Sequence, residues 1–234
     1  MRPTEPGGKE RLVSIEAGPV TLEGNLSLPD GARGVVLFAH GSGSSRHSPR
    51  NRYVAQVLNE AKLATLLVDL LTPDEEAIDM RTAHLRFDIG LLAERLVGAT
   101  DWLRQYPDTR QLRVGYFGAS TGAAAALVAA AGRPDDVGAA VSRGGRPDLA
   151  ASALARVRAP TLLIVGENDP EVIGLNQWAL AQLHCDKQFV IVPGATHLFE
   201  EPGALEEVAW LAREWFERYL TTTEVRSATE NPSG

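Results

Sequence analysis

The sequence VGYFGASTG, residues 114–122, is followed by an alanine-rich run that ends at Ala131. Its apolar beginning predicts a short buried strand, and the alanine-rich run predicts a buried helix. Between them, Ser120 stands in a G-x-S-x-G pattern, with Gly118 and Gly122 on either side. A serine lifted out of a sheet on a strained turn brings neighbouring backbones close, and a side chain at either glycine would collide with them. The stretch therefore predicts a nucleophile elbow, in which a strand, a tight turn and a helix present one serine.

Strands and helices alternate along the rest of the chain. Near the N-terminus, two segments with alternating apolar and polar residues predict an antiparallel hairpin at a sheet edge, and later continuous apolar runs predict strands covered on both faces. Strands are expected at residues 12–17, 20–28, 34–39, 63–71, 112–117, 137–142, 161–165 and 188–192, and helices at 49–61, 87–106, 121–131, 172–183 and 204–219, with a short helix that ends near 157. Residues 73–88 are expected to form a charged connection. This order predicts an α/β fold with a mostly parallel, doubly wound sheet of about eight strands.

The composition limits the class of protein. The chain has 234 residues, of which 44% are hydrophobic, and this is enough for one large core. A formal net charge of -7 argues against nucleic acid or an anionic membrane surface as the main partner. The single cysteine, Cys185, excludes an internal disulfide and fits a reducing compartment. Because residues 1–11 contain no apolar signal region and no long apolar segment follows, we expect a cytoplasmic protein that does not enter a membrane.

A single domain is expected over residues 12–220, because no repeat, linker or low-complexity segment interrupts the alternation of strands and helices. Residues 1–11 are expected to form a loose lead-in. Residues 221–234 are polar and lack periodicity, which predicts a disordered tail. Only a short segment separates the strands at 137–142 and 161–165, and it leaves no room for a separate cap domain.

Residues suited to acyl-transfer chemistry follow three of the expected strands. Ser120, Asp169 and His197 stand at strand ends, and in a sheet of this kind ligands bind outside the carboxyl ends of the strands. A serine hydroxyl is a poor nucleophile until a base takes its proton, and the imidazole that does so needs a carboxylate to fix its tautomer. We therefore expect Ser120 to be the nucleophile, His197 the general base and then acid, and Asp169 the residue that orients the imidazole.

Other residues of the same chemical types offer weaker alternatives. Asp69 also ends a strand, but it precedes the serine, whereas Asp169 stands between the serine and the histidine; Glu167 is a further alternative acid. His40 follows a buried strand and is expected to structure its own loop. Cys185 lies near the end of a helix and away from the strand ends, which argues against a catalytic cysteine.

The expected site also includes an oxyanion hole and substrate-binding arginines. The backbone N–H of Thr121 and one from the loop at Ser42 are the expected oxyanion donors. Arginines near strand ends can pair with a substrate carboxylate, and the residues considered for this role are Arg143, Arg50 and Arg81, with Arg146 and Arg86 as neighbours. The alternative is that they bond backbone carbonyls or Asp148. No Cys/His cluster, HExxH motif or phosphate-binding G-x-x-x-x-G-K motif is present, so no metal or cofactor is expected.

These features resemble the α/β-hydrolase superfamily, in which the triad follows the order serine, acid, histidine. Over residues 12–220 the chain is most similar to the small, lidless dienelactone hydrolase-like group. The loop HGSGSS (40–45) and the blocks SRGGRPD (142–148) and VPGATHLFEEPG (192–203) carry the resemblance. It implies the α/β-hydrolase fold without a cap domain, and hydrolysis of a small carboxylic ester or lactone through an acyl-enzyme. Dienelactone hydrolases proper use cysteine at the elbow, whereas this chain has Ser120, which suits ordinary esters.

Two other kinds of function remain open on the sequence. The same triad supports related acyl-enzyme chemistry, as in a thioesterase, peptidase, perhydrolase or carbon–carbon bond hydrolase, because fold and triad do not fix the substrate. A catalytically silent hydrolase fold that serves as a binding domain is the second alternative. A missing triad member would mark such a domain, and none is missing. The expected partner is therefore a small-molecule ester or lactone.

Overall fold

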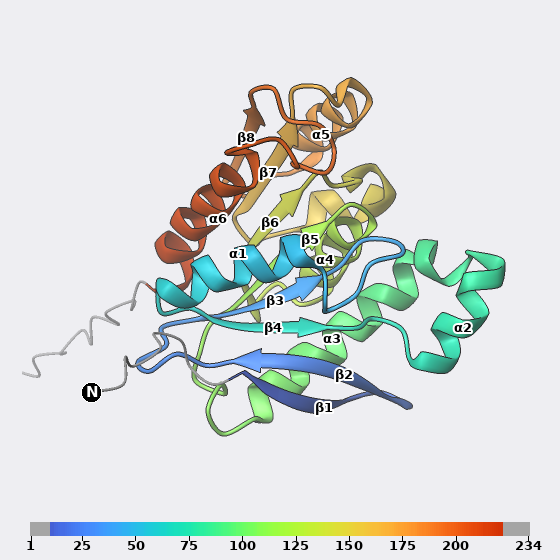
Figure 1. Ribbon diagram of the computed structural model, residues 1–234, viewed down its shortest axis with the longest axis vertical. Coiled ribbons are helices and arrows are strands. Elements are labelled where there is room, and N and C mark those ends of the chain that lie inside the picture. Colours follow the sequence, from blue (N-terminus) through green and yellow to red (C-terminus); the bar gives the residue numbers. More distant parts are fainter. Residues whose placement is uncertain (1–9, 222–234) are drawn as a thin grey trace, which may run out of the picture.

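Within residues 10–221, which the computed structural model describes, eight strands form a single sheet (Figure 1). The strands are β1 (Arg11–Ala17), β2 (Val20–Ser27), β3 (Val35–Ala39), β4 (Ala64–Val68), β5 (Val114–Ala119), β6 (Val137–Arg143), β7 (Thr161–Gly166) and β8 (Lys187–Val192). Their order across the sheet is β1-β2-β4-β3-β5-β6-β7-β8. β2 is antiparallel to both of its neighbours, and all other pairs are parallel. The expected α/β sheet, with a hairpin at one edge, is confirmed.

Helices cover both faces of the sheet. One layer, over the near face in Figure 1, consists of α1 (Pro49–Glu60) and α6 (Ala204–Leu220), and the other consists of α3 (Ile89–Gln105), α4 (Thr121–Gly132) and α5 (Pro170–Gln182). Each face has its own apolar core, because successive residues of the buried strands point to opposite faces. Phe117 and Val141 pack on the side of α1 and α6, whereas Tyr116 and Ala140 pack on the side of α4.

The serine turn lies near the centre of the sheet, between β5 and α4. Ser120 has a φ of 50°, in the left-handed region that residues other than glycine rarely adopt. A Cβ at Gly118 would lie 2.4 Å from Ala123 Cα. A Cβ at Gly122 would lie 2.3 Å from the carbonyl oxygen of Ala39. Both positions of the G-x-S-x-G pattern therefore require glycine, because backbone atoms fill the space that a side chain needs.

The connection between β4 and α3 differs from the expectation. The charged connection over residues 73–88 contains a helix, α2 (Pro73–Thr82), and a 3-10 turn, η1 (Leu85–Phe87), which project from the rest of the molecule (Figure 1). Asp79 is the buried residue of α2, so the helix has no apolar stripe that periodicity would reveal. Instead, a capping box fixes its start: Glu75 N donates to Thr72 Oγ1 at 3.2 Å, and Thr72 N donates to Glu75 Oε2 at 2.8 Å.

The segment between β6 and β7 contains a 3-10 element, η2 (Pro147–Arg156), and no separate cap domain is inserted there. Among the helices of residues 10–221, none is long and apolar enough to cross a membrane. Most of the expected lead-in and tail lies outside the described residues, which exclude 1–9 and 222–234. Within the lead-in, Arg11 already belongs to β1.

Candidate active site

His197 and Asp169 come from the loops after two neighbouring parallel strands, β8 and β7. His197 Nδ1 lies 2.7 Å from Asp169 Oδ2, and the two side chains are 40% and 15% exposed. Asp169 directly precedes α5, and its N–H donates to the carbonyl of Gly166 at 3.2 Å, which fixes the turn that carries the carboxylate. A carboxylate at Nδ1 favours the tautomer that leaves Nε2 free to accept a proton.

Ser120 and His197 both adjoin the loop that follows β6. Ser120 N donates to the carbonyl of Arg143 at 3.3 Å, so the elbow is hydrogen-bonded to the end of β6. Gly144 comes next, and a Cβ there would lie 3.5 Å from His197 Cε1. Among the described residues, no hydrogen bond joins Ser120 Oγ to His197. In unliganded enzymes this contact is often long and tightens when substrate binds. The structure thus brings Ser120, His197 and Asp169 to the end of the sheet where β5, β7 and β8 have their carboxyl ends.

The other acids near the strand ends have different partners. Asp69 Oδ1 accepts the backbone N–H of Arg46 at 2.7 Å, and its second oxygen pairs with the guanidinium of Arg46. Glu167 Oε2 accepts a backbone N–H of the loop after β8 at 2.7 Å. Asp169 is therefore the carboxylate that contacts His197.

Cys185 lies at the other end of the sheet. Its thiol is 3.7 Å from the hydroxyl of Thr161, the first residue of β7, whereas the residues of the expected triad follow the carboxyl ends of the strands. Burial raises the pKa of the thiol, which opposes a reactive thiolate. Among residues 10–221, no group of three or more His, Cys, Asp or Glu side chains is arranged to hold a metal ion.

His40 uses both ring nitrogens within the fold. Its Nδ1 donates to the carbonyl oxygen of Gly41 at 3.0 Å, and its Nε2 accepts the N–H of Leu70 at 3.2 Å. Burial lowers the pKa of the ring, which favours the neutral form that this pattern requires. His40 therefore fixes the carbonyl oxygen of the peptide bond that joins Gly41 to Ser42. The N–H of the same peptide bond belongs to Ser42 and points away from that oxygen.

The two expected oxyanion donors, Ser42 and Thr121, lie next to each other. Thr121 is the first residue of α4, where backbone N–H groups lack acceptors within the helix. Ser42 N donates to Thr121 Oγ1 at 3.0 Å, and the two hydroxyl oxygens are also 3.0 Å apart. The Thr121 hydroxyl, which the sequence analysis does not single out, thus holds the Ser42 loop against the elbow. An oxyanion bound here must share the Ser42 N–H with the Thr121 hydroxyl, or replace that hydroxyl as the acceptor.

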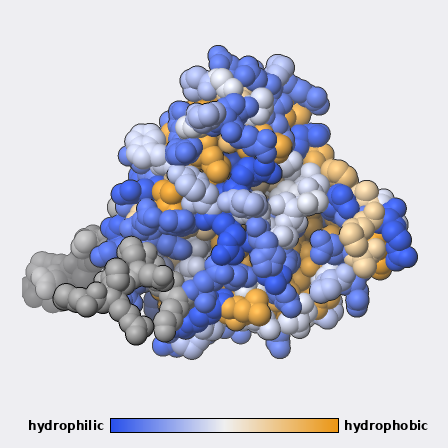
Figure 2. Space-filling model, in the orientation of Figure 1, coloured by the Kyte–Doolittle hydropathy of each residue, from blue (hydrophilic) through white to orange (hydrophobic). Residues whose placement is uncertain are grey.

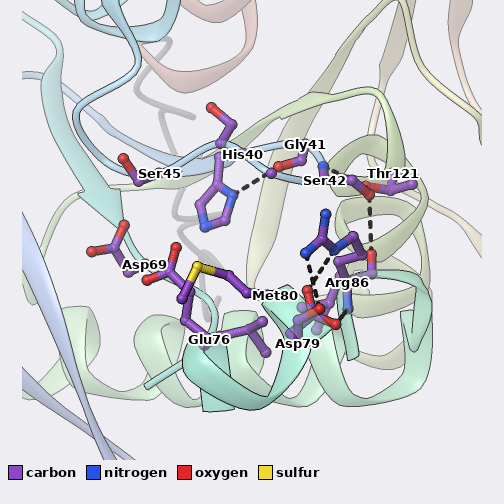
Figure 3. A pocket seen from close by; sticks show the side chains of 14 residues that line it. His40, Gly41, Ser42, Ser45, Asp69, Glu76, Asp79, Met80, Arg86 and Thr121 are labelled. Atoms are coloured by element: carbon purple, nitrogen blue, oxygen red, sulfur yellow. Dashed lines mark hydrogen bonds and ion pairs between the residues drawn. The ribbon is translucent and has the colours of Figure 1, made fainter. Parts of the chain in front are cut away.

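A cavity of about 240 Å³ opens beside these two donors (Figure 3). It lies between the loop after β3, the loop after β4, and α2. Its lining residues are His40, Gly41, Ser42, Gly43, Ser44, Ser45, Asp69, Leu71, Glu76, Asp79, Met80, Arg86, Leu92 and Thr121. The cavity therefore adjoins the expected oxyanion hole, and Ser120, Asp169 and His197 are not among its lining residues.

α2 contributes one wall of this cavity, and the sequence did not predict that wall. Glu76 and Met80 line the cavity, and Met80 is 72% exposed on a helix whose surface is partly apolar (Figure 2). Arg86 also lines the cavity, and its Nε donates to Asp79 Oδ2 at 2.5 Å. Arg81, one of the arginines considered for substrate binding, is exposed in the last turn of α2 and is not among the residues that line the cavity.

The arginines near the end of β6 have contrasting environments. Arg146 donates two hydrogen bonds to Asp148, at 2.9 and 2.8 Å, as the alternative interpretation expects. Arg143 is only 8% exposed, and its Nε and Nη1 have no partner among the described residues. Burial, together with the charge of Arg50, lowers the pKa of Arg143 to about 10. Arg50 itself donates from Nη1 to Glu200 Oε1 at 2.8 Å.

Comparison with known proteins shows the family to which the chain belongs. The dienelactone hydrolase family matches residues 26–223. The chain belongs to the dienelactone hydrolase family. The crystal structure of a dienelactone hydrolase from Anabaena variabilis has 68% sequence identity and a TM-score of 0.90, and the match covers 92% of this chain and 100% of that one. Est1E from Butyrivibrio proteoclasticus has a TM-score of 0.74 at 16% identity, over 88% of this chain and 98% of its own, and shares the fold.

Curated relatives from two strains of Mycobacterium tuberculosis carry the name "Putative phosphoribosyl transferase" and are 59% identical over 216 residues. The match covers 92% of this chain and 48% of each relative, so the chain spans about half the length of the curated relatives it matches. The resemblance to the dienelactone hydrolase-like α/β-hydrolases is confirmed.

Proposed function

We propose that this chain is a serine hydrolase that cleaves small carboxylic esters or lactones through an acyl-enzyme. One observation carries the proposal: an elbow serine, Ser120, lies at the same sheet edge as the hydrogen-bonded pair of His197 and Asp169. Membership of the dienelactone hydrolase family supports hydrolysis as the reaction class. The single cysteine also favours a cytoplasmic location for the enzyme.

Acylation begins when Ser120 Oγ attacks the carbonyl carbon of the ester while His197 Nε2 takes the hydroxyl proton. Asp169 holds the imidazole through Nδ1 and stabilises the imidazolium that forms. The tetrahedral intermediate then collapses, the bond to the alkoxy oxygen breaks, and that oxygen leaves with the proton from His197. An ester releases a free alcohol, whereas a lactone opens and keeps its alcohol on the acyl group.

Deacylation repeats these steps with water as the nucleophile. His197 takes a proton from the water as its oxygen attacks the acyl carbon, and a second tetrahedral intermediate forms. Ser120 Oγ then leaves, recovers the proton from His197, and the carboxylic acid is released. Ser120 is partly exposed at the open edge of the sheet, so water can reach the acyl-enzyme.

The negative charge of each tetrahedral intermediate resides on the former carbonyl oxygen. We assign its stabilisation to the N–H groups of Thr121 and Ser42, with a further contribution from the N-terminal dipole of α4. His40 fixes the Gly41–Ser42 peptide through the Gly41 carbonyl. Such a preorganised donor needs little reorganisation when charge develops.

The cavity beside the oxyanion donors limits the size of the group that binds there. Its volume of about 240 Å³ lies below the range of ordinary drug-sized pockets. Leu71, Met80 and Leu92 supply apolar surface, and Glu76 supplies a carboxylate at one wall. A short acyl or alcohol group without negative charge fits this lining, and a long lipid chain does not.

The name carried by the mycobacterial relatives describes proteins about twice as long as the matched region. Transferase activity is therefore not part of the proposal, because nothing in the elbow or in the His197–Asp169 pair favours it over acyl transfer.

A substrate panel tests the proposal against related acyl-enzyme chemistries. Purified full-length chain is assayed with short-chain esters, lactones, a thioester and an anilide, and Ser120→Ala is the control. The proposal expects ester or lactone hydrolysis that falls by at least ~10³-fold in the variant. Thioester or anilide turnover faster than that of every ester and lactone would favour the related chemistries. Absence of any turnover that depends on Ser120 would favour a binding domain.

A further inference from the structure

Asn176 is a fully buried polar residue in the middle of α5. Its Nδ2 donates to the carbonyl oxygen of Gly145 at 2.9 Å and to that of Val172 at 2.8 Å. These two acceptors fix the orientation of the amide, because a rotated amide would place Oδ1 against both carbonyl oxygens. Val172 lies one turn earlier in the same helix, so the bond to Gly145 is the tertiary contact of the two.

Gly145 belongs to the loop that follows β6, and three elements enclose it. A Cβ at this position would collide with Ser142 Oγ, near the end of β6, and would lie 2.7 Å from the Cβ of Ala123 in α4. The amide of Asn176, from α5, contacts the third side. The loop therefore approaches the helix of the serine elbow more closely than a side chain would allow.

The same loop holds the backbone of the expected nucleophile from both sides. Ser120 N donates to the carbonyl oxygen of Arg143 at 3.3 Å, and Arg146 N donates to the carbonyl oxygen of Ser120 at 3.1 Å. Ser120 has a strained φ of 50°, and surrounding contacts must maintain such a conformation. Gly145 lies between the two loop residues that form these bonds. Its position therefore determines where the elbow is held.

The loop and α5 also adjoin the other two residues of the expected triad. A Cβ at Gly144 would lie 3.2 Å from the carbonyl oxygen of His197 and 3.5 Å from its Cε1. Asp169 is the N-cap residue of α5 and precedes Asn176 by about two helical turns, so the two residues lie on the same side of the helix. The amide thus ties the helix that begins at the acid to the loop that holds the serine.

A purely packing role would be served better by an apolar residue. The buried residues of α5 are Val172, Asn176 and Ala179, so the amide interrupts an otherwise apolar stripe. Asn176 Oδ1 has no hydrogen-bond partner within residues 10–221, and neither has Ser142 Oγ on the other side of the loop. Buried polar atoms of this kind lower stability. Departures from an apolar core at such a cost are expected where they support a functional site.

We propose that Asn176 is a positioning residue for the reaction. Through Gly145 it fixes the loop that holds Ser120, and so sets the position of the nucleophile relative to the histidine–aspartate pair. The inference rests on the proposed function, because the position of Ser120 matters to the rate only if its hydroxyl attacks a substrate. A nucleophile displaced by about 1 Å can lose on the order of 10²-fold in rate, so a contact distant from the substrate can support catalysis.

Asn176→Leu tests the hydrogen bond, because leucine keeps the branched shape and has no donor. Hydrolysis of the best ester or lactone is measured well below the melting temperature of the variant. We expect kcat to fall about 10- to 100-fold, with KM within about two-fold. The pH at which kcat/KM is half-maximal should not change, because the contact between His197 and Asp169 remains. An unchanged kcat, or a shifted pH profile, overturns the proposal.

Thr109→Val is the matched control for the loss of a buried hydrogen bond. Thr109 is buried, and its hydroxyl donates to the carbonyl oxygen of Leu103 at 2.7 Å. It precedes β5, at the opposite end of the sheet from the loop after β6. We expect this variant to lower the melting temperature as Asn176→Leu does, with kcat within about two-fold of the unmodified protein. An equal loss of kcat in the two variants would reflect general destabilisation and overturn the proposal.

Amide hydrogen exchange separates this inference from the serine hydrolase proposal. In Asn176→Leu, the N–H groups of Ser120 and Arg146 should exchange at least about 10-fold faster, while those of β3 and β4 keep their rates. Should this variant fail to fold, Asn176→Ala takes its place with the same expected results, because it also lacks the donor.

The two proposals can then fail independently. If exchange changes as expected but the unmodified protein hydrolyses nothing, the contact of Asn176 with the loop holds the elbow and the serine hydrolase proposal falls. If the unmodified protein hydrolyses an ester or lactone while exchange and kcat are unchanged in the variant, the positioning role of Asn176 falls alone.

Discussion

His197 Nδ1 and Asp169 Oδ2 lie 2.7 Å apart, although 28 positions separate the two residues along the chain. They meet because β7 and β8 are parallel neighbours in which Gly166 pairs with Val192, so both following loops leave the sheet at the same edge. The two side chains are therefore in contact without a bound substrate. Preorganisation of this kind is what a general base needs, since reorienting the imidazole during the reaction would raise the barrier.

Asp169→Asn tests the role of this contact. The amide is isosteric, but it no longer fixes the tautomer or stabilises the imidazolium, so kcat should fall by roughly 10²–10⁴ with little change in KM. The measurement is steady-state hydrolysis of the best ester or lactone in the panel. Glu167→Gln is the control and should stay within about two-fold, because Glu167 accepts a backbone N–H and does not contact His197. Similar losses in both variants would contradict the assignment of Asp169.

Gly122→Ala tests the packing of the elbow. The added Cβ would lie 2.3 Å from the carbonyl oxygen of Ala39 and 2.4 Å from that of His40, and neither backbone can move without distorting β3. We expect a loss of about 3 kcal/mol or more in the free energy of unfolding, measured by urea denaturation.

Gly132→Ala is the matched control at the other end of α4. A Cβ at Gly132 meets no atom within 4 Å, so alanine should leave the fold intact and stabilise it by up to about 1 kcal/mol through helix propensity. Equal effects of the two substitutions would mean that the close approach of the β3 backbone does not exclude a side chain at position 122.

His40 should make the stability of the protein sensitive to acid. Burial lowers its pKa in the folded state, so below about pH 6.5 the unfolded chain binds a proton that the native protein does not. This contribution to stability is complete above the unfolded pKa and is lost as the pH falls toward the folded pKa. The free energy of unfolding should therefore decline between pH 7.5 and 5, by at most about 1.4 kcal/mol per pH unit from this group.

His40→Gln removes the titration while it keeps a donor and an acceptor at this position. Its free energy of unfolding, measured by urea denaturation across the same pH range, should decline less steeply than that of the unmodified protein. His47→Gln provides the control, because His47 is exposed and its replacement should leave the slope unchanged. Parallel curves for all three proteins would show that burial of His40 does not couple its protonation to folding.

The sheet and the elbow could be predicted from the sequence because their signals are local. The buried strands are continuous apolar runs, and the pattern around Ser120 requires glycine for reasons of space at Gly118 and Gly122. Asp169 and His197 could be chosen as candidate site residues because each follows a strand. The carboxyl ends of parallel strands lie at the same end of a sheet. Contact between the two side chains depends on strand register, which the sequence pattern does not specify.

The missed features are those in which polar groups are buried. α2 has Asp79 as its buried residue, so hydrophobic periodicity is absent, although the capping residues Thr72 and Glu75 were a readable sign of its start. The burial of Arg143 at a strand end could not be predicted, because charged residues there are usually solvated. The hydrogen bond from Ser42 to the Thr121 hydroxyl also arises from loop geometry rather than from any residue pattern.

The most direct test of the serine hydrolase account is the intact mass of the protein after incubation with a fluorophosphonate. The account predicts a single stoichiometric adduct on the unmodified chain and none on Ser120→Ala, because the reagent needs both an activated serine and a working oxyanion hole. Folded protein that gains no adduct, or an adduct that persists in Ser120→Ala, would contradict it.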